Sequence, residues 1–228
     1  MSDLTIKQVE SGSELRAFIN FPWQVYKNDP NWVPPLRLQI KEKLNRKKNP
    51  FFEHAEMALF LARSGQEIVG RIAAIIDFNH NEYHGEKVVF FGLYESLNDE
   101  QVARLLLETV IDWGKKRGME ILRGPVNLSM NDECAFLLEG FDRPPTIMMP
   151  YNPPYYIELM EKCGLSKAKD LYAYFMDRDH ETEQQVKAVV GKIKQITSFK
   201  MRTANLRKVQ QETKKIAYIY NQAWAKNW

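Results

Sequence analysis

Glu95 is the side chain whose type and position best suit acid–base chemistry. It follows the run at residues 88–94, which is almost continuously apolar and therefore predicts a strand covered on both faces. A carboxylate at the end of such a strand can have a raised pKa and can then accept a proton from an ammonium group. We therefore take Glu95 as the candidate general base, with a solvated surface carboxylate as the alternative.

A second polar group follows the next predicted strand. Asn127, Asn131 and Glu133 lie close together in the sequence, and Asp132 belongs to the same cluster. Amide and carboxylate groups can hold a polar substrate by hydrogen bonds, so Asn127, Asn131 and Glu133 are candidate substrate-binding residues. Solvation at the surface is again the alternative.

The sequence lacks the patterns of several other catalytic classes. His80 and His84 flank a carboxylate, but they are predicted to follow a strand and no third ligand is evident, so we expect no metal site. There is no Walker loop and no recognisable Ser-His-Asp or Cys-His arrangement, which argues against kinases and hydrolases. Cys134 and Cys163 lack disulfide or zinc spacing, and we expect a reducing, cytoplasmic location.

The composition fits one full domain and an appendage. Of the 228 residues, 44% are hydrophobic and 12% aromatic, enough for a single large core. Residues 181–228 contain ten Lys or Arg against three Asp or Glu, spaced as on a solvated helix face rather than a nucleic-acid surface. No signal peptide or membrane span is predicted, and we expect no membrane partner. We place the domain at residues 1–180 and the basic appendage at 181–228.

Hydrophobic periodicity and turn residues predict the order of the elements. In chain order we expect strand 4–9, a helix from the capping box 11–14 to residue 26, helix 36–48, strands 55–63 and 66–78 joined as a hairpin, strand 88–94, a helix between the N-cap at 98 or 99 and Gly118, strand 119–126, helix 153–163 and strand 171–176. The strand, helix and strand of residues 88–126 form a parallel crossover. Residues 127–149 remain a long irregular segment, and such segments are usually functional.

This order of elements resembles the GNAT N-acetyltransferase fold. Residues 66–73 resemble the polar turn and Val-Gly of the family's third strand, and residues 155–165 resemble its late helix ending at a glycine. A closer resemblance is to a group of bacterial GNAT-like proteins, through motifs at residues 21–26, 32–35, 123–125, 131–133, 140–142 and 149–156. The expected fold class is therefore α/β (α+β), with a mixed central sheet flanked by helices.

The resemblance implies direct transfer of an acyl group from acetyl-CoA, or another acyl-CoA, to an amine on a small molecule or a protein. In the family, the central strand splays from its parallel neighbour and its backbone bonds the pantetheine arm. The cofactor-binding positions carried over are Phe91, Gly92, Leu93 and Tyr94 on that strand, and Asn98, Gln101, Val102 and Ala103 near the phosphates at the next helix N-terminus. For Gly92, a simple packing glycine is the alternative.

The sequence departs from the family pattern at two places. The family's glycine-rich turn is replaced by residues 96–103, which contain no glycine and put Asp99 and Glu100 in the first turn, where they compete with phosphate. The family's acid tyrosine is replaced by Met160. Tyr156 lies one turn earlier on the same helical face and is the candidate acid, with a half-buried aromatic ring as the alternative. The second hypothesis is therefore a catalytically inactive GNAT-like module that binds a ligand or a protein partner.

The end of the chain resembles its beginning. Residues 5–9 and 200–204 each precede a helix, a tryptophan and an Asn-Trp pair. We therefore expect residues 181–228 to begin a second GNAT-like domain, inside which the chain stops. An ordinary C-terminal helix and closing strand are the alternative. Residues 199–204 should add to a sheet edge, and the apolar stripe of the following helix should pack on the domain or on a second copy of the chain in a homodimer.

Overall fold

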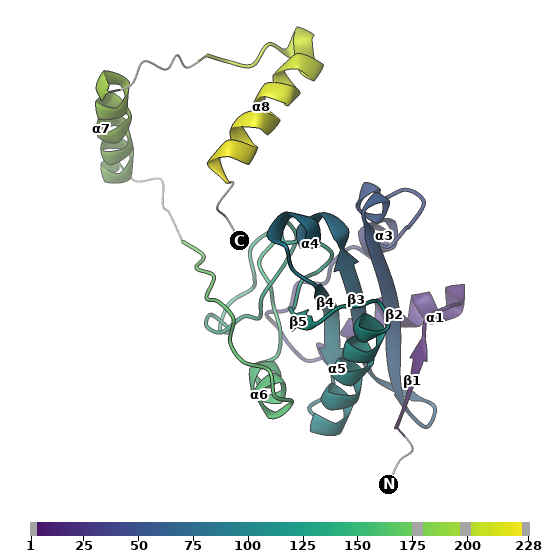
Figure 1. Cartoon of the computed structure of the whole chain (residues 1–228). Helices are drawn as coiled ribbons and strands as arrows, with labels where there is room; N and C mark the ends of the chain where they lie inside the picture. The colour runs from purple at the N-terminus through teal and green to yellow at the C-terminus, as the bar shows by residue number, and fades with distance from the viewer. Residues whose placement is uncertain (1–3, 175–179, 197–201, 225–228) are drawn as a thin grey trace. The chain divides into compact units, whose positions relative to one another are not determined.

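A mixed five-stranded sheet forms the centre of the domain (Figure 1). Its strands lie side by side in the order in which they occur in the chain. The first four pair antiparallel with their neighbours, whereas the fifth runs parallel to the fourth. The strands are β1 (Leu4–Gln8), β2 (Ala55–Ser64), β3 (Glu67–Asp77), β4 (Val88–Ser96) and β5 (Ile121–Arg123). The predicted hairpin and parallel crossover are therefore confirmed.

The structure is a computed structural model that describes residues 4–174, 180–196 and 202–224. A first unit ends at Leu171 and a second begins at Tyr172. The second unit contains α7 (His180–Ile196), the 3-10 turn η2 (Leu206–Lys208) and α8 (Val209–Ala223). Of the strand expected at residues 199–204, the last three form no strand and the others lie outside the described residues. The boundary at residue 180 and the second GNAT-like domain therefore stay predictions.

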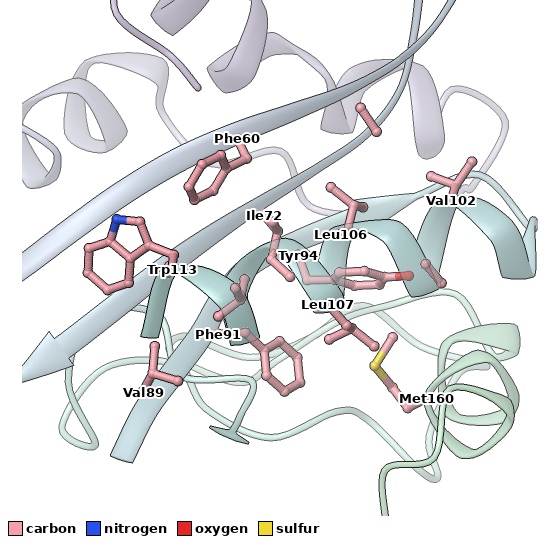
Figure 2. Packing of buried hydrophobic residues seen from close by; sticks show 14 of the residues in the cluster. Phe60, Ile72, Val89, Phe91, Tyr94, Val102, Leu106, Leu107, Trp113 and Met160 are labelled. Atoms are coloured by element: carbon pink, nitrogen blue, oxygen red, sulfur yellow. The ribbon is translucent and has the colours of Figure 1, made fainter. Parts of the chain in front are cut away.

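The helices α5 (Glu100–Lys115) and α6 (Tyr155–Lys162) cover one face of the sheet (Figure 1). Apolar residues recur every three or four positions along α5, so one side of the helix is buried. Figure 2 shows Leu106 and Trp113 of this helix packed with Ile72 and Phe91 of the sheet and Met160 of α6. Burying side chains of this size stabilises the fold by about 1.5–3 kcal/mol each.

The N-terminal helices lie over the other face of the sheet. They are α1 (Gly12–Asn20), α2 (Pro22–Val25) and α3 (Arg37–Lys43), and the 3-10 turn η1 (Pro50–Glu53) follows them. Ser11 and Glu14 form the predicted capping box of α1, and Phe18 is fully buried. The expected single helix to residue 26 is divided, because Pro22 has no N–H to donate inside a helix and begins α2 instead.

The strand β4 contains a bulge close to its C-terminal end. Between the pairs Ala73–Gly92 and Arg71–Glu95, one residue of β3 faces two residues of β4. Leu93, at the bulge, has a φ of 48°, which is uncommon for a residue other than glycine. The bulge interrupts the alternation of side chains between the two faces of the sheet. The side chains after the bulge therefore do not continue the alternation of those before it.

The strand β5 ends at Arg123, earlier than the predicted end at residue 126. Pro125 has no N–H for the ladder, and the chain then crosses β4 at close range. The Val126 amide donates to the Phe91 carbonyl at 2.8 Å, and a Cβ on Gly92 would lie only 2.0 Å from the Val126 carbonyl oxygen. Residues 127–149 contain no helix or strand, as expected for this fully described segment.

Two further local predictions were wrong. Residues 171–174 form no strand, and the rest of the strand expected at 171–176 lies outside the described residues. His80 and His84 lie on the short helix α4 (Phe78–His84), which Asp77 caps, and their rings are 4.4 Å apart. Within the described part of the chain, no group of three or more His, Cys, Asp or Glu residues could hold a metal ion.

Candidate functional site

Three side chains meet the carboxylate of Glu95 at the end of β4. The hydroxyl of Tyr26 donates to Glu95 Oε2 at 2.9 Å, and that of Tyr156 donates to the same oxygen at 2.7 Å. Arg71 Nη2 lies 3.6 Å from the other oxygen, Oε1. The partners come from the end of α2, from α6 and from β3, so three distant segments build the site around one carboxylate. The two predicted acid–base residues, Glu95 and Tyr156, are in direct contact.

Burial controls the protonation of this cluster. It raises the pKa of Glu95 above its ordinary value, although Arg71 and the two tyrosine hydroxyls oppose the shift. Only 13% of the Glu95 side-chain surface is exposed. Burial, together with the Glu95 charge, also raises the pKa of Tyr156 well above its ordinary value. The Tyr156 hydroxyl therefore keeps its proton, and Glu95 binds a proton more readily than a solvated carboxylate does.

Arg71 supplies a fixed positive charge beside Glu95. Its Nη1 donates to the Phe18 carbonyl at 2.9 Å, and its guanidinium lies 4.9 Å from the centre of the Phe18 ring. The Nε atom is buried and has no hydrogen-bond partner among the described residues. Such an unpaired buried donor costs about 1–3 kcal/mol.

Aromatic rings lie beside Glu95 on the side of Tyr26. The Tyr26 ring stacks on Trp32 at 4.8 Å, and Trp32 meets Trp23 edge-on at 5.3 Å. Tyr151 lies 6.0 Å from Tyr26, and its hydroxyl donates to Asp29. Because Tyr26 is only 3% exposed, this aromatic group excludes water from its hydrogen bond with the carboxylate.

The β4 residues predicted to bind acyl-CoA lie against the segment that follows β5. The Leu93 amide donates to Asn127 Oδ1 at 2.8 Å. The side chains of Phe91 and Tyr94 are buried in the core on the α5 side. The Asn127 side chain thus accepts a hydrogen bond from the backbone of β4, the strand whose backbone the family resemblance expects to bond pantetheine.

The N-terminus of α5 suits a pyrophosphate less well. Asp99 Oδ1 accepts from the Gln101 amide at 2.8 Å and from the Val102 amide at 3.3 Å. The side chains of Val102 and Ala103 are buried, whereas Asn98 is exposed. The Asp99 carboxylate therefore holds two amides that a phosphate would use, and its negative charge opposes that of a phosphate.

The three predicted substrate-binding residues fall into two places. Asn127 Nδ2 donates to Glu133 Oε2 at 3.3 Å, and the backbone amide of Asn127 donates to the Glu133 carbonyl at 2.9 Å. Asn131 lies in the neighbouring turn, where its amide donates to the Ser129 hydroxyl, which in turn donates to Asp132. The structure therefore joins Asn127 and Glu133 to the bulge of β4, and it places Asn131 in a separate turn.

Tyr26 and Arg71 belong to the site but were not among the predicted site residues. Arg71 carried a signal in the sequence, because a charged residue in an otherwise apolar strand is buried only with a partner. Tyr26 carried none, since its contact with Glu95 spans 69 positions of the chain.

The arrangement of strands and helices defines the fold of this protein. An antiparallel sheet of four strands, a parallel pair joined through α5, a bulge in β4 and a late helix make up the GNAT fold. The chain has this fold, as its motifs predicted. No helix in the described ranges combines the length and the apolar character needed to span a membrane.

Comparison with known proteins gives two curated relatives. The chain is 36% identical over 230 residues to the bacterial ceramide synthase of Caulobacter vibrioides. This match covers 100% of this chain and 59% of that protein. It is 35% identical over 217 residues to the protein YghO of Escherichia coli, covering 95% of this chain and 55% of that protein. The chain therefore spans less than two thirds of the length of either relative.

The chain was also compared with family models and with solved structures. No family model matches the chain. One similar solved structure is an aminoglycoside acetyltransferase from an uncultured soil metagenomic sample, with 12% identity and a TM-score of 0.47. That likeness covers 77% of this chain and 97% of the other.

Proposed function

We propose that the chain is an acyl-CoA-dependent N-acyltransferase in which Glu95 takes the proton from the amine to be acylated. The observation that carries this proposal is the Glu95 carboxylate itself, which is buried, has a raised pKa and lies just after the bulge of a GNAT fold. An acyl thioester supplies an activated acyl carbon, and the protein must supply a neutral amine. The free thiols of Cys134 and Cys163 support a reducing cytoplasm as the place of action.

Glu95 and Tyr156 suffice to move the protons of such a transfer. The ionised carboxylate accepts a proton from the ammonium substrate, which frees the nitrogen lone pair. As the C–N bond forms and the C–S bond breaks, the departing thiolate takes the Tyr156 hydroxyl proton while Glu95 passes its own proton to the Tyr156 oxygen through their 2.7 Å hydrogen bond, so that no tyrosinate forms. The acylated nitrogen then loses its extra proton to Glu95 and from there to solvent. One proton is released overall, and both residues return to their starting states.

The name of one relative supports a class of substrate. A ceramide is an amide of a fatty acid with a long-chain amino alcohol, so a ceramide synthase joins a fatty acyl group to an amine. We propose the same chemistry here, with a fatty acyl-CoA and a long-chain amino alcohol. The aromatic rings beside Glu95 support an apolar substrate.

The test combines acyl-CoA thioesters from acetyl to palmitoyl with short and long amino alcohols, and amides are detected by mass spectrometry. Amide formation only with short partners would overturn the long-chain class. Ligand binding by calorimetry without any amide product would overturn the transferase and support the inactive binding module.

Replacing Tyr156 with Phe should lower the transfer rate by about a hundredfold, a typical contribution of a positioned proton donor. The hydroxyl also accepts from the buried Ser96 amide at 2.9 Å, so the variant should lose about 1–3 kcal/mol of stability. Tyr155→Phe is the matched control, because that hydroxyl donates to the Ser96 carbonyl and not to Glu95. Steady-state rates and urea unfolding measure both effects, and equal rate losses in the two variants would exclude a specific role for Tyr156.

Replacing Asn127 with Ala should tighten acyl-CoA binding by about threefold to tenfold. The change frees the Leu93 N–H from its 2.8 Å bond to Asn127 Oδ1, and a net hydrogen bond is worth about 0.5–1.5 kcal/mol. Calorimetric titration with coenzyme A and an acyl-CoA measures the difference, with Asn131→Ala as the control in the neighbouring turn. Unchanged or weaker binding in Asn127→Ala would show that the ligand does not use the Leu93 amide.

A further inference from the structure

An exposed apolar segment precedes and enters α3. Residues 33–39 are all exposed, and among them Val33, Leu36 and Leu38 are 55%, 65% and 67% exposed. Two prolines lie between Val33 and Leu36, so residues 33–36 carry no polar side chain. Three exposed apolar side chains this close together in the chain favour a surface that contacts an apolar partner.

The same segment continues into a strongly basic stretch. Residues 36–48 contain six Lys or Arg and one acidic residue, Glu42. Lys43 pairs with Asp132 at 2.7 Å. Among the residues that the structure describes, Lys41, Lys47 and Lys48 form no ion pair, and all three are exposed. Their charge is thus available to an anionic partner.

A pocket of about 520 Å³ lies between α1 and α3. Its lining includes Leu15, Arg16, Ile19, Asn20, Arg37 and Lys41. Arg37 is fixed there by a 2.7 Å hydrogen bond to Asn20 Oδ1, and its guanidinium lies 3.8 Å from the centre of the Trp23 ring. Two apolar side chains and three cations suit a ligand that joins an anionic group to hydrocarbon.

We propose that α3 and the loop before it dock on the surface of an anionic phospholipid bilayer, with a lipid headgroup in the α1–α3 pocket. Apolar side chains flanked by lysines are the composition of segments that lie in the membrane interface without spanning it. A soluble acidic partner would account for the cations but not for the exposed Leu36 and Leu38. The sequence alone led us to expect no membrane partner, since exposure and the pocket are visible only in the fold. The inference does not rest on the proposed transfer reaction.

Vesicle binding by the whole chain tests how much the lysines contribute to membrane binding. The full chain is sedimented with vesicles of phosphatidylcholine alone and of phosphatidylcholine mixed with phosphatidylglycerol. Binding should require phosphatidylglycerol, and Lys47→Gln/Lys48→Gln should weaken it by about 25-fold, at about fivefold for each lysine near an anionic surface. Lys115→Gln/Lys116→Gln is the matched control, because it removes two adjacent exposed lysines at the end of α5 and should bind as the unmodified chain does.

A second pair of variants tests the apolar contribution. Leu36→Ser/Leu38→Ser should weaken binding to the anionic vesicles by about tenfold or more, because both leucines would leave the interface. Leu206→Ser/Val209→Ser removes exposed apolar surface from the second unit and should have no effect. Circular dichroism establishes that each variant is folded. Equal binding to neutral and anionic vesicles, or equal losses in test and control variants, would overturn the proposal.

Discussion

Glu95→Gln should lower acyl transfer by about a hundredfold or more, because glutamine keeps the shape of the side chain but cannot accept the proton of an ammonium substrate. In the unmodified chain, transfer should fall as the pH falls through the pKa of Glu95, since only the ionised carboxylate is a base. Burial raises that pKa, so the loss should occur at a higher pH than for a solvated carboxylate. The measurement is the pH profile of kcat/KM, and the variant should lack this acidic limb.

Two controls separate chemistry from folding. Glu108→Gln removes an exposed carboxylate from α5 and should leave the rate unchanged. Thermal unfolding of Glu95→Gln shows whether the variant is folded at the assay temperature, since Arg71 Nη2 loses its charged partner at 3.6 Å. A folded Glu95→Gln variant with a normal rate and an unchanged pH profile would remove Glu95 from the mechanism.

Gly92→Ala should destabilise the domain by about 3 kcal/mol or more, near the upper end of what a single overpacking change produces. The added Cβ would lie 2.0 Å from the carbonyl oxygen of Val126 and 2.8 Å from its carbonyl carbon, and backbone atoms cannot move aside as a flexible side chain can. Urea unfolding measures the loss. Gly12→Ala is the control, because a Cβ there meets no atom within 4 Å. Equal stability of the two variants would show that the chain does not cross β4 at Gly92.

The sequence predicted most of the sheet and its helices because these elements follow from local patterns. The apolar runs of β2 and β3, the turn at Gly65 and the cap at Asp99 are each determined by residues close in the chain. The end of β5 could be predicted only in part, because Pro125 has no N–H for the ladder but the path of the chain after it is not a local property. Residues 124–126 cross β4 at close range, and this depends on a tertiary contact with Gly92.

The candidate site was predicted only in part, because some of its residues follow from local patterns and others depend on tertiary contacts. Glu95 and Tyr156 followed from a strand end and from a helical turn, whereas their direct contact is visible only in the fold. Tyr26 was not found, because no local pattern distinguishes a tyrosine that bonds a distant carboxylate from one that packs on the surface. Asn127 was found as a polar residue, but its bond to the Leu93 amide depends on the bulge in β4.

Because Tyr26 and Tyr156 share one oxygen of Glu95, the site can be complete only after all three residues have been synthesised. Tyr26 leaves the ribosome early, Glu95 follows much later, and Tyr156 emerges only near the end of the domain. Domains generally fold as units as they are synthesised. A nascent chain that has not reached α6 lacks the second hydroxyl on the carboxylate. The proposed chemistry can therefore begin only after the last helix of the domain has docked.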